Sequence, residues 1–227
     1  MKLISKKKKE EKLLFKVVVG YLKWSDEEEF VENVSKMKEF LKKFEKGGID
    51  CCTEEIDYIY LLMGMCYQEG KGIKKNIPKS IENYEKSIKK KNGFAMHQLA
   101  YLYLHGIGKN KDVKESLNLF KKASKKGISI SILHLGEIHL EKENYDKAFQ
   151  CFNRSSEMDD ILSILRLAKL YEFGHLNIKK DYKKSFQFYE KASMLGDSFS
   201  FYKMAIFYEN SLGKKKKKKK KKNLIYF

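Results

Sequence analysis

The 227-residue sequence contains a single proline, and it has no apolar run approaching the ~18 residues that span a membrane. Its four cysteines, Cys51, Cys52, Cys66 and Cys151, include no CxxC pair, which is typical of reduced thiols in an intracellular protein. The apolar stretch of residues 13–22 carries a lysine and has no small-residue cleavage site, so no cleaved signal peptide is expected. We therefore expect a cytoplasmic protein without a transmembrane segment, with the nucleus as the alternative location.

The sequence also lacks the patterns of catalytic and cofactor sites. Its five histidines form no HExxH motif and no i,i+4 pair, whereas a zinc site needs ligands that converge. Two glycine-rich segments, residues 70–72 and 106–108, lack the preceding strand and the Lys-Ser/Thr pair of a phosphate-binding loop. We therefore expect no metal, no cofactor and no enzymatic activity.

Positive charge is abundant but unevenly spread. Of the net charge of +18, Lys6–Lys9 and Lys214–Lys222 contribute thirteen units, which leaves +5 for the rest of the chain. Nine consecutive lysines repel one another and bury nothing, so residues 214–227 are predicted to be a disordered polylysine tail. One interpretation of this tail is low-complexity drift. The other gives an alternative function, in which the protein binds nucleic acid or an acidic membrane surface through the tail.

Internal repeats are the strongest signal in the sequence. One helical pattern, here called helix A, recurs five times with a small residue followed three places later by an aromatic residue or histidine. Successive small residues are separated by 36, 36, 32 and 37 residues, and the second column keeps the same spacings, which indicates a structural repeat. Both columns are predicted to pack in the core. They are Gly64, Ala100, Gly136, Ala168 and Ala205, and then Tyr67, Tyr103, His139, Tyr171 and Tyr208.

A second helix, here called helix B, follows each of the first four helices A. It has a small residue, an aromatic residue four places on and another small residue three places further, so all three share one helical face. Small residues let a neighbouring helix come close, so each A/B pair is predicted to be a hairpin with a core of aromatic rings. No such hairpin covers its own apolar face, so the hairpins should stack. The four triplets are Ser80, Tyr84 and Ser87, then Ser116, Phe120 and Ala123, then Ala148, Phe152 and Ser155, and finally Ser185, Tyr189 and Ala192.

The loops between the helices carry capping residues. Glycine favours the left-handed conformation that ends a helix, and Asn or Asp accepts hydrogen bonds from the first-turn amides of a helix. The predicted C-caps of helices A are Gly70, Gly106 and Gly174, and the predicted N-caps of helices B are Asn76, Asp112 and Asp181. The third unit lacks the longer glycine-rich loop and is predicted to turn at residues 143–144 instead.

Three segments are predicted along the chain. Residues 53–213 form the repeat solenoid, and residues 214–227 form the polylysine tail. Residues 1–52 form an N-terminal helical cap or a degenerate repeat, because the capping box of residues 25–28 begins a helix of about 20 residues that two glycines end at residues 47–48. Residues 13–22 are the predicted partner of that helix.

The repeat resembles the Sel-one-like repeat, a relative of the tetratricopeptide repeat. The resemblance implies an all-α fold, a right-handed superhelical solenoid of antiparallel hairpins in which helices A line the concave side. It also implies a non-enzymatic adaptor or scaffold for a protein or peptide partner, in protein quality control with a ubiquitin ligase or in signalling. The residues that match the family pattern in the second unit are Ala95, Leu99, Ala100, Tyr103, Gly106, Gly108, Asp112, Ser116, Phe120, Ala123 and Gly127.

Two further columns of helix A are predicted to read the partner. They lie two places before and one place after the small residue, on one face that points away from the packing columns. Their residues change from apolar in the first unit to charged in the fourth, and a surface that recognises a specific partner needs such variation. The alternative is a solvent-exposed face whose residues vary without functional constraint. The columns are Leu62, Gln98, His134, Arg166 and Lys203, and Met65, Tyr101, Glu137, Lys169 and Ile206.

Overall fold

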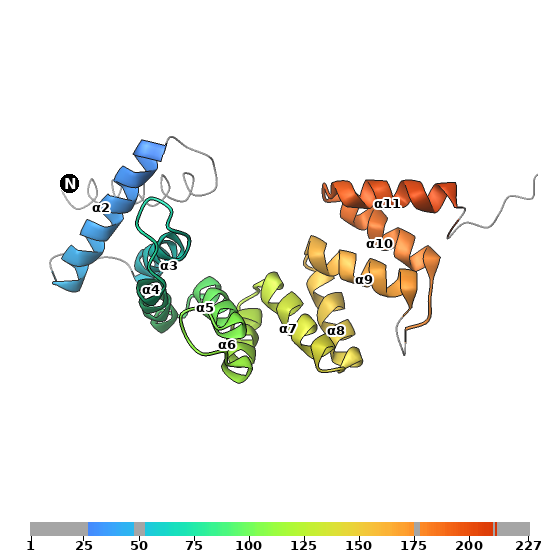
Figure 1. Ribbon diagram of the computed structural model, residues 1–227, viewed down its shortest axis with the longest axis horizontal. Coiled ribbons are helices and arrows are strands. Elements are labelled where there is room, and N and C mark those ends of the chain that lie inside the picture. Colours follow the sequence, from blue (N-terminus) through green and yellow to red (C-terminus); the bar gives the residue numbers. More distant parts are fainter. Residues whose placement is uncertain (1–26, 48–52, 175–177, 211, 213–227) are drawn as a thin grey trace, which may run out of the picture. The chain divides into compact units, whose positions relative to one another are not determined.

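The computed structural model describes residues 27–47, 53–174, 178–210 and 212. Every helix in these ranges is an α-helix, ten in all, which confirms the predicted all-α class (Figure 1). The helices are α2 (Glu27–Glu45), α3 (Thr53–Glu69), α4 (Ile77–Lys89), α5 (Gly93–His105), α6 (Val113–Lys125), α7 (Ser129–Glu141), α8 (Tyr145–Ser156), α9 (Ile161–Phe173), α10 (Tyr182–Met194) and α11 (Ser198–Glu209).

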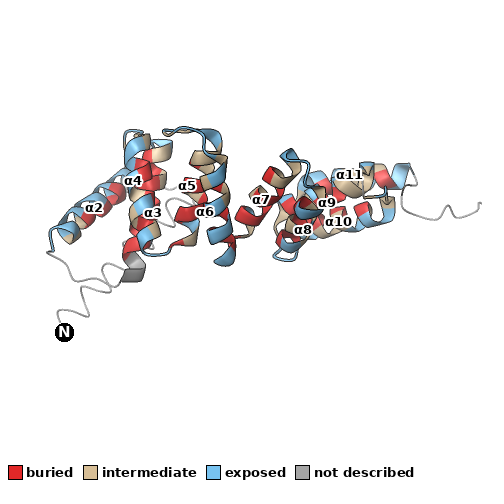
Figure 2. Ribbon diagram, turned by 90° about the horizontal axis from the view of Figure 1, so that it is seen from below, coloured by how far each residue is buried: buried red, intermediate tan, exposed pale blue. Residues whose placement is uncertain are grey.

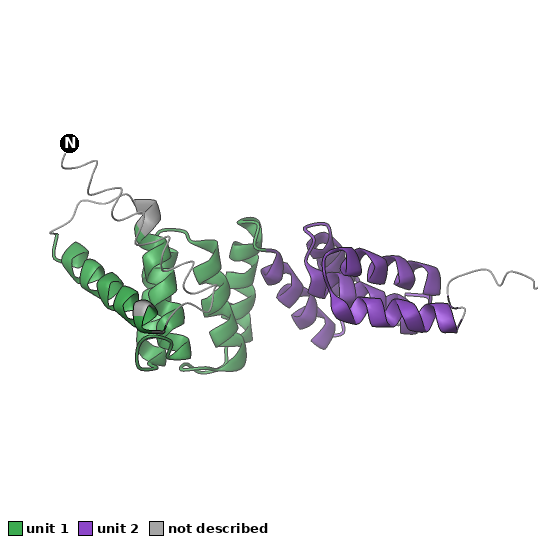
Figure 3. Cartoon of the chain, turned by 90° about the horizontal axis from the view of Figure 1, so that it is seen from above, with its two compact units in different colours: residues 1–128 green, residues 129–227 purple. Residues whose placement is uncertain are grey.

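The helices pack mainly as the four predicted hairpins, α3 with α4, α5 with α6, α7 with α8 and α9 with α10. Helices α3, α5, α7, α9 and α11 are the helices A, and α4, α6, α8 and α10 are the helices B. The chain forms two compact units, unit 1 (residues 1–128) and unit 2 (residues 129–227), each with two complete hairpins (Figure 3). The handedness of the superhelix and the predicted segment limits stay predictions. The polylysine tail and residues 13–22 lie outside the described residues.

Side-chain caps explain where many of the helices begin. All three predicted N-caps of helices B accept a hydrogen bond from the backbone N–H three residues on: Asn76 from Lys79, Asp112 from Glu115 and Asp181 from Lys184. Three helices A are capped in the same way by residues that the sequence pattern had not indicated, namely Asn92, Asp160 and Asp197. Such a cap stabilises a helix by about 1 kcal/mol.

The small and aromatic columns fit into each other within a hairpin. A Cβ atom on Gly64 would lie 2.5 Å from Cε1 of Tyr84, and one on Gly136 would lie 2.6 Å from Cε1 of Phe152. Ala168 and Tyr189 occupy one core cluster, and Phe120 is completely buried, as is Ala100. The four helix B aromatics therefore form the core of the hairpins, with the buried residues along the facing sides of the helices (Figure 2).

The second small residue of each helix B has a backbone role that the sequence pattern did not indicate. In the fourth hairpin this residue is Ala192, which is completely buried, and its carbonyl accepts a hydrogen bond from the backbone N–H of Asp197 at 3.1 Å. Asp197 is the N-cap of α11, so Ala192 helps to turn the chain from α10 into the next helix A. The equivalent bonds end the other three hairpins, from Asn92 to Ser87, from Ile128 to Ala123 and from Asp160 to Ser155.

The helix A aromatics differ from the prediction that they are core residues. Tyr67 is buried, but Tyr103 and Tyr171 are half-buried, and Tyr208 is exposed. Lysine ammonium groups lie over the rings of the first three, Lys79 over Tyr67 at 5.7 Å, Lys109 over Tyr103 at 5.3 Å and Lys184 over Tyr171 at 5.0 Å. This column lies at the edge of each hairpin, where a ring packs on one side and meets a lysine on the other.

The glycine C-caps are confirmed in part. Gly106 has φ 67° and ψ 33°, the left-handed conformation. Gly174 has φ 73° but ψ 157°, so the prediction of a left-handed cap there is wrong; this region is also open essentially only to glycine. The backbone N–H of Gly174 still bonds to the carbonyl of Leu170, as in a helix end.

Within unit 1, helix α2 packs on the first hairpin in the manner of a helix B. Gly108 lies so close to the start of α4 that a Cβ atom would overlap Ile77 and make a tight contact with Ile81. Gly72, in the equivalent loop one repeat earlier, has the same relation to Phe30 and Val34 of α2. The spacing of four residues is the same in both helices, so α2 takes the place of a helix B in front of the first repeat. The interpretation of residues 1–52 as a helical cap or a degenerate repeat stays a prediction.

Candidate protein-interaction site

The ten predicted partner-binding residues differ in accessibility. Leu62 differs from the expectation that its column points away from packing: it is 7% exposed, because it belongs to the cluster formed by α2 and α3. Arg166 and Lys169 of α9 are exposed. The others are partly buried: Met65, Gln98, Tyr101, His134, Glu137, Lys203 and Ile206.

Lys203 has a structural partner that the sequence pattern did not reveal. Its ammonium group lies 2.6 Å from Oε1 of Glu172, and the two side chains are 15% and 12% exposed. The other oxygen of Glu172 accepts a hydrogen bond from the hydroxyl of Tyr189 at 2.7 Å, and the ammonium lies 5.5 Å from the centre of that ring. Burial, with this bond, raises the pKa of Tyr189. Lys203 therefore joins α11 to α9 and α10.

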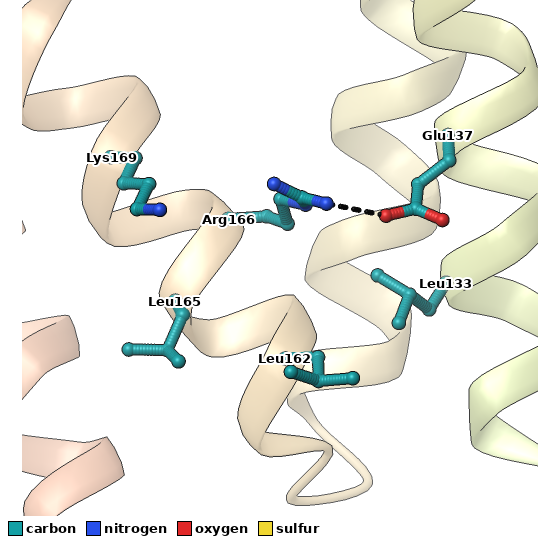
Figure 4. A pocket seen from close by; sticks show the side chains of 6 residues that line it. All are labelled: Leu133, Glu137, Leu162, Leu165, Arg166 and Lys169. Atoms are coloured by element: carbon teal, nitrogen blue, oxygen red, sulfur yellow. Dashed lines mark hydrogen bonds and ion pairs between the residues drawn. The ribbon is translucent and has the colours of Figure 1, made fainter. Parts of the chain in front are cut away.

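Unit 2 contains a pocket of about 150 Å³ between two successive helices A, α7 and α9 (Figure 4). Three leucines, Leu133, Leu162 and Leu165, supply its apolar lining. The other lining residues are Glu137, Arg166 and Lys169, all three of which belong to the predicted partner-binding columns. The structure thus brings together charged members of both columns around an apolar hollow.

Glu137 is fixed between two basic side chains. Nδ1 of His134 lies 3.1 Å from Oε2 of Glu137, and Nη2 of Arg166 donates to Oε1 at 2.7 Å. The hydrogen bond with His134, reinforced by that with Arg166, lowers the pKa of Glu137 to about 2. The carboxylate is therefore ionised throughout the neutral range, and it positions Arg166 across the opening between α7 and α9.

Lys169 is the more available cation at this pocket. Among the described residues it forms no ion pair, and its ammonium group lies 5.8 Å from the centre of the Phe199 ring. Leu162 is 53% exposed and lines the pocket, so it presents apolar surface at the opening. Leu162 was missed by the column analysis, although it precedes Arg166 by four residues and so lies on the same helical face.

In unit 1 the predicted columns are less concentrated. The rings of Tyr101 and His105 on α5 lie 4.3 Å apart, and both side chains reach the surface. A second hollow of about 220 Å³ lies instead at the start of α5, where Tyr58 and Phe94 are among the lining residues. Next to it Asn92 donates to Oδ2 of Asp57 at 3.0 Å, which couples α3 to the N-cap of α5.

The described part of the chain shows no group of three or more His, Cys, Asp or Glu side chains arranged to hold a metal ion. Within the same ranges, no helix has the length and apolarity needed to cross a membrane. Burial raises the pKa of the Cys66 thiol to about 12, so this cysteine stays protonated and unreactive.

Comparison with protein families agrees with the hairpins. The model described as Sel1 repeat matches residues 60–92, 93–128, 131–160 and 161–197, together more than half of the chain. The chain belongs to the Sel1 repeat family. In this Sel1 repeat protein each match covers one A/B hairpin, the first match starting inside α3. Sel1 repeats generally serve as scaffolds for protein–protein interaction.

Two solved structures are similar to this chain. A Sel1 repeat protein from Oxalobacter formigenes is 21% identical, with a TM-score of 0.61 over 79% of this chain and 80% of the other. The c5321 protein of uropathogenic Escherichia coli, described as a protective antigen with an SLR fold, is 21% identical over 79% of this chain and 53% of its own, with a TM-score of 0.44. At such identities the first likeness shows the fold alone. A search of curated protein sequences found no significant match.

Proposed function

We propose that this Sel1 repeat protein is a non-enzymatic scaffold that holds a protein partner on the A-helix face of unit 2. The partner places an apolar side chain in the hollow between α7 and α9 and an acidic group beside Lys169. The observation that carries the proposal is the pocket itself, in which three leucines are bordered by a fixed Glu137–Arg166 ion pair and by a lysine with no ionic partner among the described residues.

The chemistry of the pocket suits a peptide segment. A hollow of about 150 Å³ accepts an apolar group of roughly the size of a benzene ring, and burying such a side chain contributes ~1.5–3 kcal/mol. The charges at the edge add selectivity rather than much affinity, because like charges are rejected more strongly than opposite charges are attracted. Since Glu137 already pairs with Arg166, the net charge presented to a partner is positive.

Display of random peptides on phage tests this proposal. The full-length protein, immobilised through its N-terminus, should select peptides that place Asp or Glu within a few residues of Leu, Met or Phe. With Lys169→Glu the selected charge should change from acidic to basic, because the substitution reverses the charge beside the pocket. Leu162→Asp should reduce selection of the apolar residue, because it puts a carboxylate at the opening.

A charge reversal on another surface is the control. Lys147→Glu on α8 makes the same change of net charge at an exposed residue that does not line the pocket. It should leave the selected sequences unchanged. If Lys147→Glu and Lys169→Glu alter selection equally, the peptides respond to overall charge, and the α7–α9 pocket is not the docking site.

The alternative, binding of nucleic acid or an acidic membrane through the polylysine tail, concerns residues outside the described ranges and stays a prediction. The two functions are separable, because peptides that bind the pocket should be selected equally by a variant in which Lys214–Lys222 are replaced by Gly and Ser.

A further inference from the structure

A pairing rule recurs in the four hairpins. The ring of helix B packs against the small residue of helix A, and in the first and fourth hairpins the tyrosine hydroxyl reaches the residue four places after that small residue. Where this residue is polar, the ring is a tyrosine: Tyr84 donates to Oε1 of Gln68 at 2.9 Å, and Tyr189 donates to Oε2 of Glu172 at 2.7 Å. At the equivalent sequence positions the other two hairpins have Phe120 with Leu104 and Phe152 with Leu140.

Helix α11 has the small residue and the polar residue against which a helix B tyrosine packs. No helix B follows it among the described residues. Its small residue, Ala205, is exposed, whereas the equivalent residues of α3, α5, α7 and α9 are all buried. Four places on is Glu209, which is exposed and makes no hydrogen bond or ion pair within the described part of the chain. The pairing rule therefore predicts that a helix packed against Ala205 and Glu209 carries a tyrosine.

The rest of the receiving face is exposed as well. Phe201 is 60% exposed, whereas the residues at the same position in the other helices A, Tyr60, Met96, Ile132 and Ile164, are at most 7% exposed. Tyr202 is 62% exposed, whereas its equivalents Leu61, His97 and Leu133 are at most 8% exposed and Leu165 is half-buried. The opposite face of α11 is occupied, because Phe207 is buried against the ring of Tyr189 on α10. The accessible face is therefore the one that a helix B covers in every other unit.

The same helix also carries the triplet by which a helix B supplies its ring. Ser198, Tyr202 and Ala205 reproduce the spacing of small residue, aromatic residue and small residue found in the helices B, as in α10 with Ser185, Tyr189 and Ala192. Only α11 among the helices A combines this triplet with a small residue and a polar residue in the receiving positions. The helix is thus complementary to itself.

We propose that a second copy of this chain docks on α11, with the two α11 helices antiparallel about a twofold axis. Tyr202 of each copy lies over Ala205 of the other, and its hydroxyl donates to the Glu209 carboxylate of the other.

The register supports this arrangement, because it satisfies every contact at once. In the first hairpin Tyr84 lies opposite Gly64, so in an antiparallel pair Ser80 lies opposite Gln68 and Ser87 opposite Leu61. If Tyr202 lies opposite Ala205 of a second copy, twofold symmetry places Ala205 opposite Tyr202 and Ser198 opposite Glu209. Both sets of contacts are those of an A/B hairpin, and neither requires a shift in register. An interface that matches itself under a twofold axis gives a closed dimer.

The charge of the chain sets the conditions for the test. Each copy has a net charge of +18, so two copies repel, and the repulsion is screened when the Debye length falls to a few ångströms. Sedimentation equilibrium of the full chain at about 0.5 M salt should therefore show a concentration-dependent monomer–dimer equilibrium, and the dimer should weaken as the salt concentration is lowered.

Variants identify the surface. Ala205→Arg should abolish the dimer, because it fills the place of the incoming ring with a charge. Tyr202→Phe should weaken association roughly 30-fold, because it removes both symmetry-related hydrogen bonds to Glu209 and nothing else, and Tyr202→Ala should weaken it more. Phe94→Ala on α5, a residue that is 48% exposed in unit 1, is the control and should leave the equilibrium unchanged.

Circular dichroism of each variant shows whether α11 remains helical, and Tyr202→Phe is too small a change to unfold it. A wild-type protein that remains monomeric at about 200 µM in high salt overturns the proposal. A dimer that survives Ala205→Arg overturns it as well, because association then uses another surface. Equal dimerisation by Tyr202→Phe and the wild-type protein overturns the hydrogen bond to Glu209.

Discussion

The ring of Tyr84 lies directly against the backbone of Gly64, so that a Cβ atom on Gly64 would come within 2.5 Å of Cε1. Gly136 and Phe152 have the same relation in unit 2. A residue without a side chain lets a completely buried ring reach the axis of the neighbouring helix. Close approach of the two helices is therefore specified by a pair of residues, one small and one aromatic, that lie 20 positions apart in the first hairpin and 16 in the third.

Overpacking of this column should destabilise the fold. Ala100 is completely buried, as is Phe120 in the same hairpin. Ala100→Leu should lower the free energy of unfolding by about 1–3 kcal/mol, because the added carbons force the neighbouring side chains to move. Ala205→Leu is the matched control, since Ala205 has the same repeat position but is exposed. In dilute protein, thermal unfolding should shift for Ala100→Leu and stay nearly constant for Ala205→Leu; equal shifts would contradict the packing.

The pairing of Tyr84 with Gln68 should show up in a double-mutant cycle. Tyr84→Phe removes the donor and Gln68→Leu removes the acceptor of a 2.9 Å hydrogen bond. Each single substitution should cost about 1 kcal/mol, because the remaining group loses its partner. The double variant reproduces the Leu/Phe pair of the second hairpin, so it should be about 1 kcal/mol more stable than the sum of the single effects predicts. Additive effects in urea denaturation would show that the hydrogen bond contributes nothing.

The sequence predicted the columns that repeat locally. Helical spacing puts Ser80, Tyr84 and Ser87 on one face whatever the partner is, so the hairpin cores were predictable. Glycine positions and side-chain caps such as Asp112 follow from local backbone requirements in the same way. The repeat spacing also showed that α7 and α9 are equivalent helices, which is why Glu137 and Arg166 were placed in neighbouring columns.

Contacts between distant segments were not predictable from one column. Leu62 is buried because α2 covers it, and nothing in the sequence of α3 shows this. Lys203 pairs with Glu172 from the preceding helix A, so a charge that varied along its column proved to be a structural link. Tyr103 has the consensus position of a core residue, yet its depth depends on how far the edge of the hairpin is covered. In each of these cases the burial or pairing of the residue depends on its neighbours in the fold and not on its residue type.

The ion pair of unit 2 should contribute to stability in acid. Because His134 and Arg166 lower the pKa of Glu137 to about 2, below its ordinary value of 4.5, the folded state favours the ionised carboxylate. This stabilisation is fully present above pH ~4.5 and is lost as the pH falls toward 2. Glu137→Gln should therefore reduce stability at pH 6 and flatten the decline between pH 4.5 and 2 in urea denaturation. Glu141→Gln, an exposed neighbour on α7, is the control.

The buried pair of Lys203 and Glu172 gives the sharpest test of how α11 is attached. Lys203→Met leaves the Glu172 carboxylate, only 12% exposed, with the hydroxyl of Tyr189 as its remaining partner in the described structure. Loss of one member of such a pair should cost on the order of 1–3 kcal/mol, because a largely buried charge stays behind. Amide hydrogen exchange should consequently accelerate in α9, α10 and α11, and exchange in α3 to α6 should remain as in the wild-type protein.

The triple variant Glu172→Leu, Tyr189→Phe and Lys203→Met replaces the charged group by the Leu/Phe pair of the second and third hairpins. It should recover most of the lost protection, because apolar residues pack in place of a buried ion pair without leaving a charge unpaired. Exchange that is unchanged by Lys203→Met, or no slower in the triple variant than in the single one, would show that α11 is held by the packing of Phe207 and not by this ion pair.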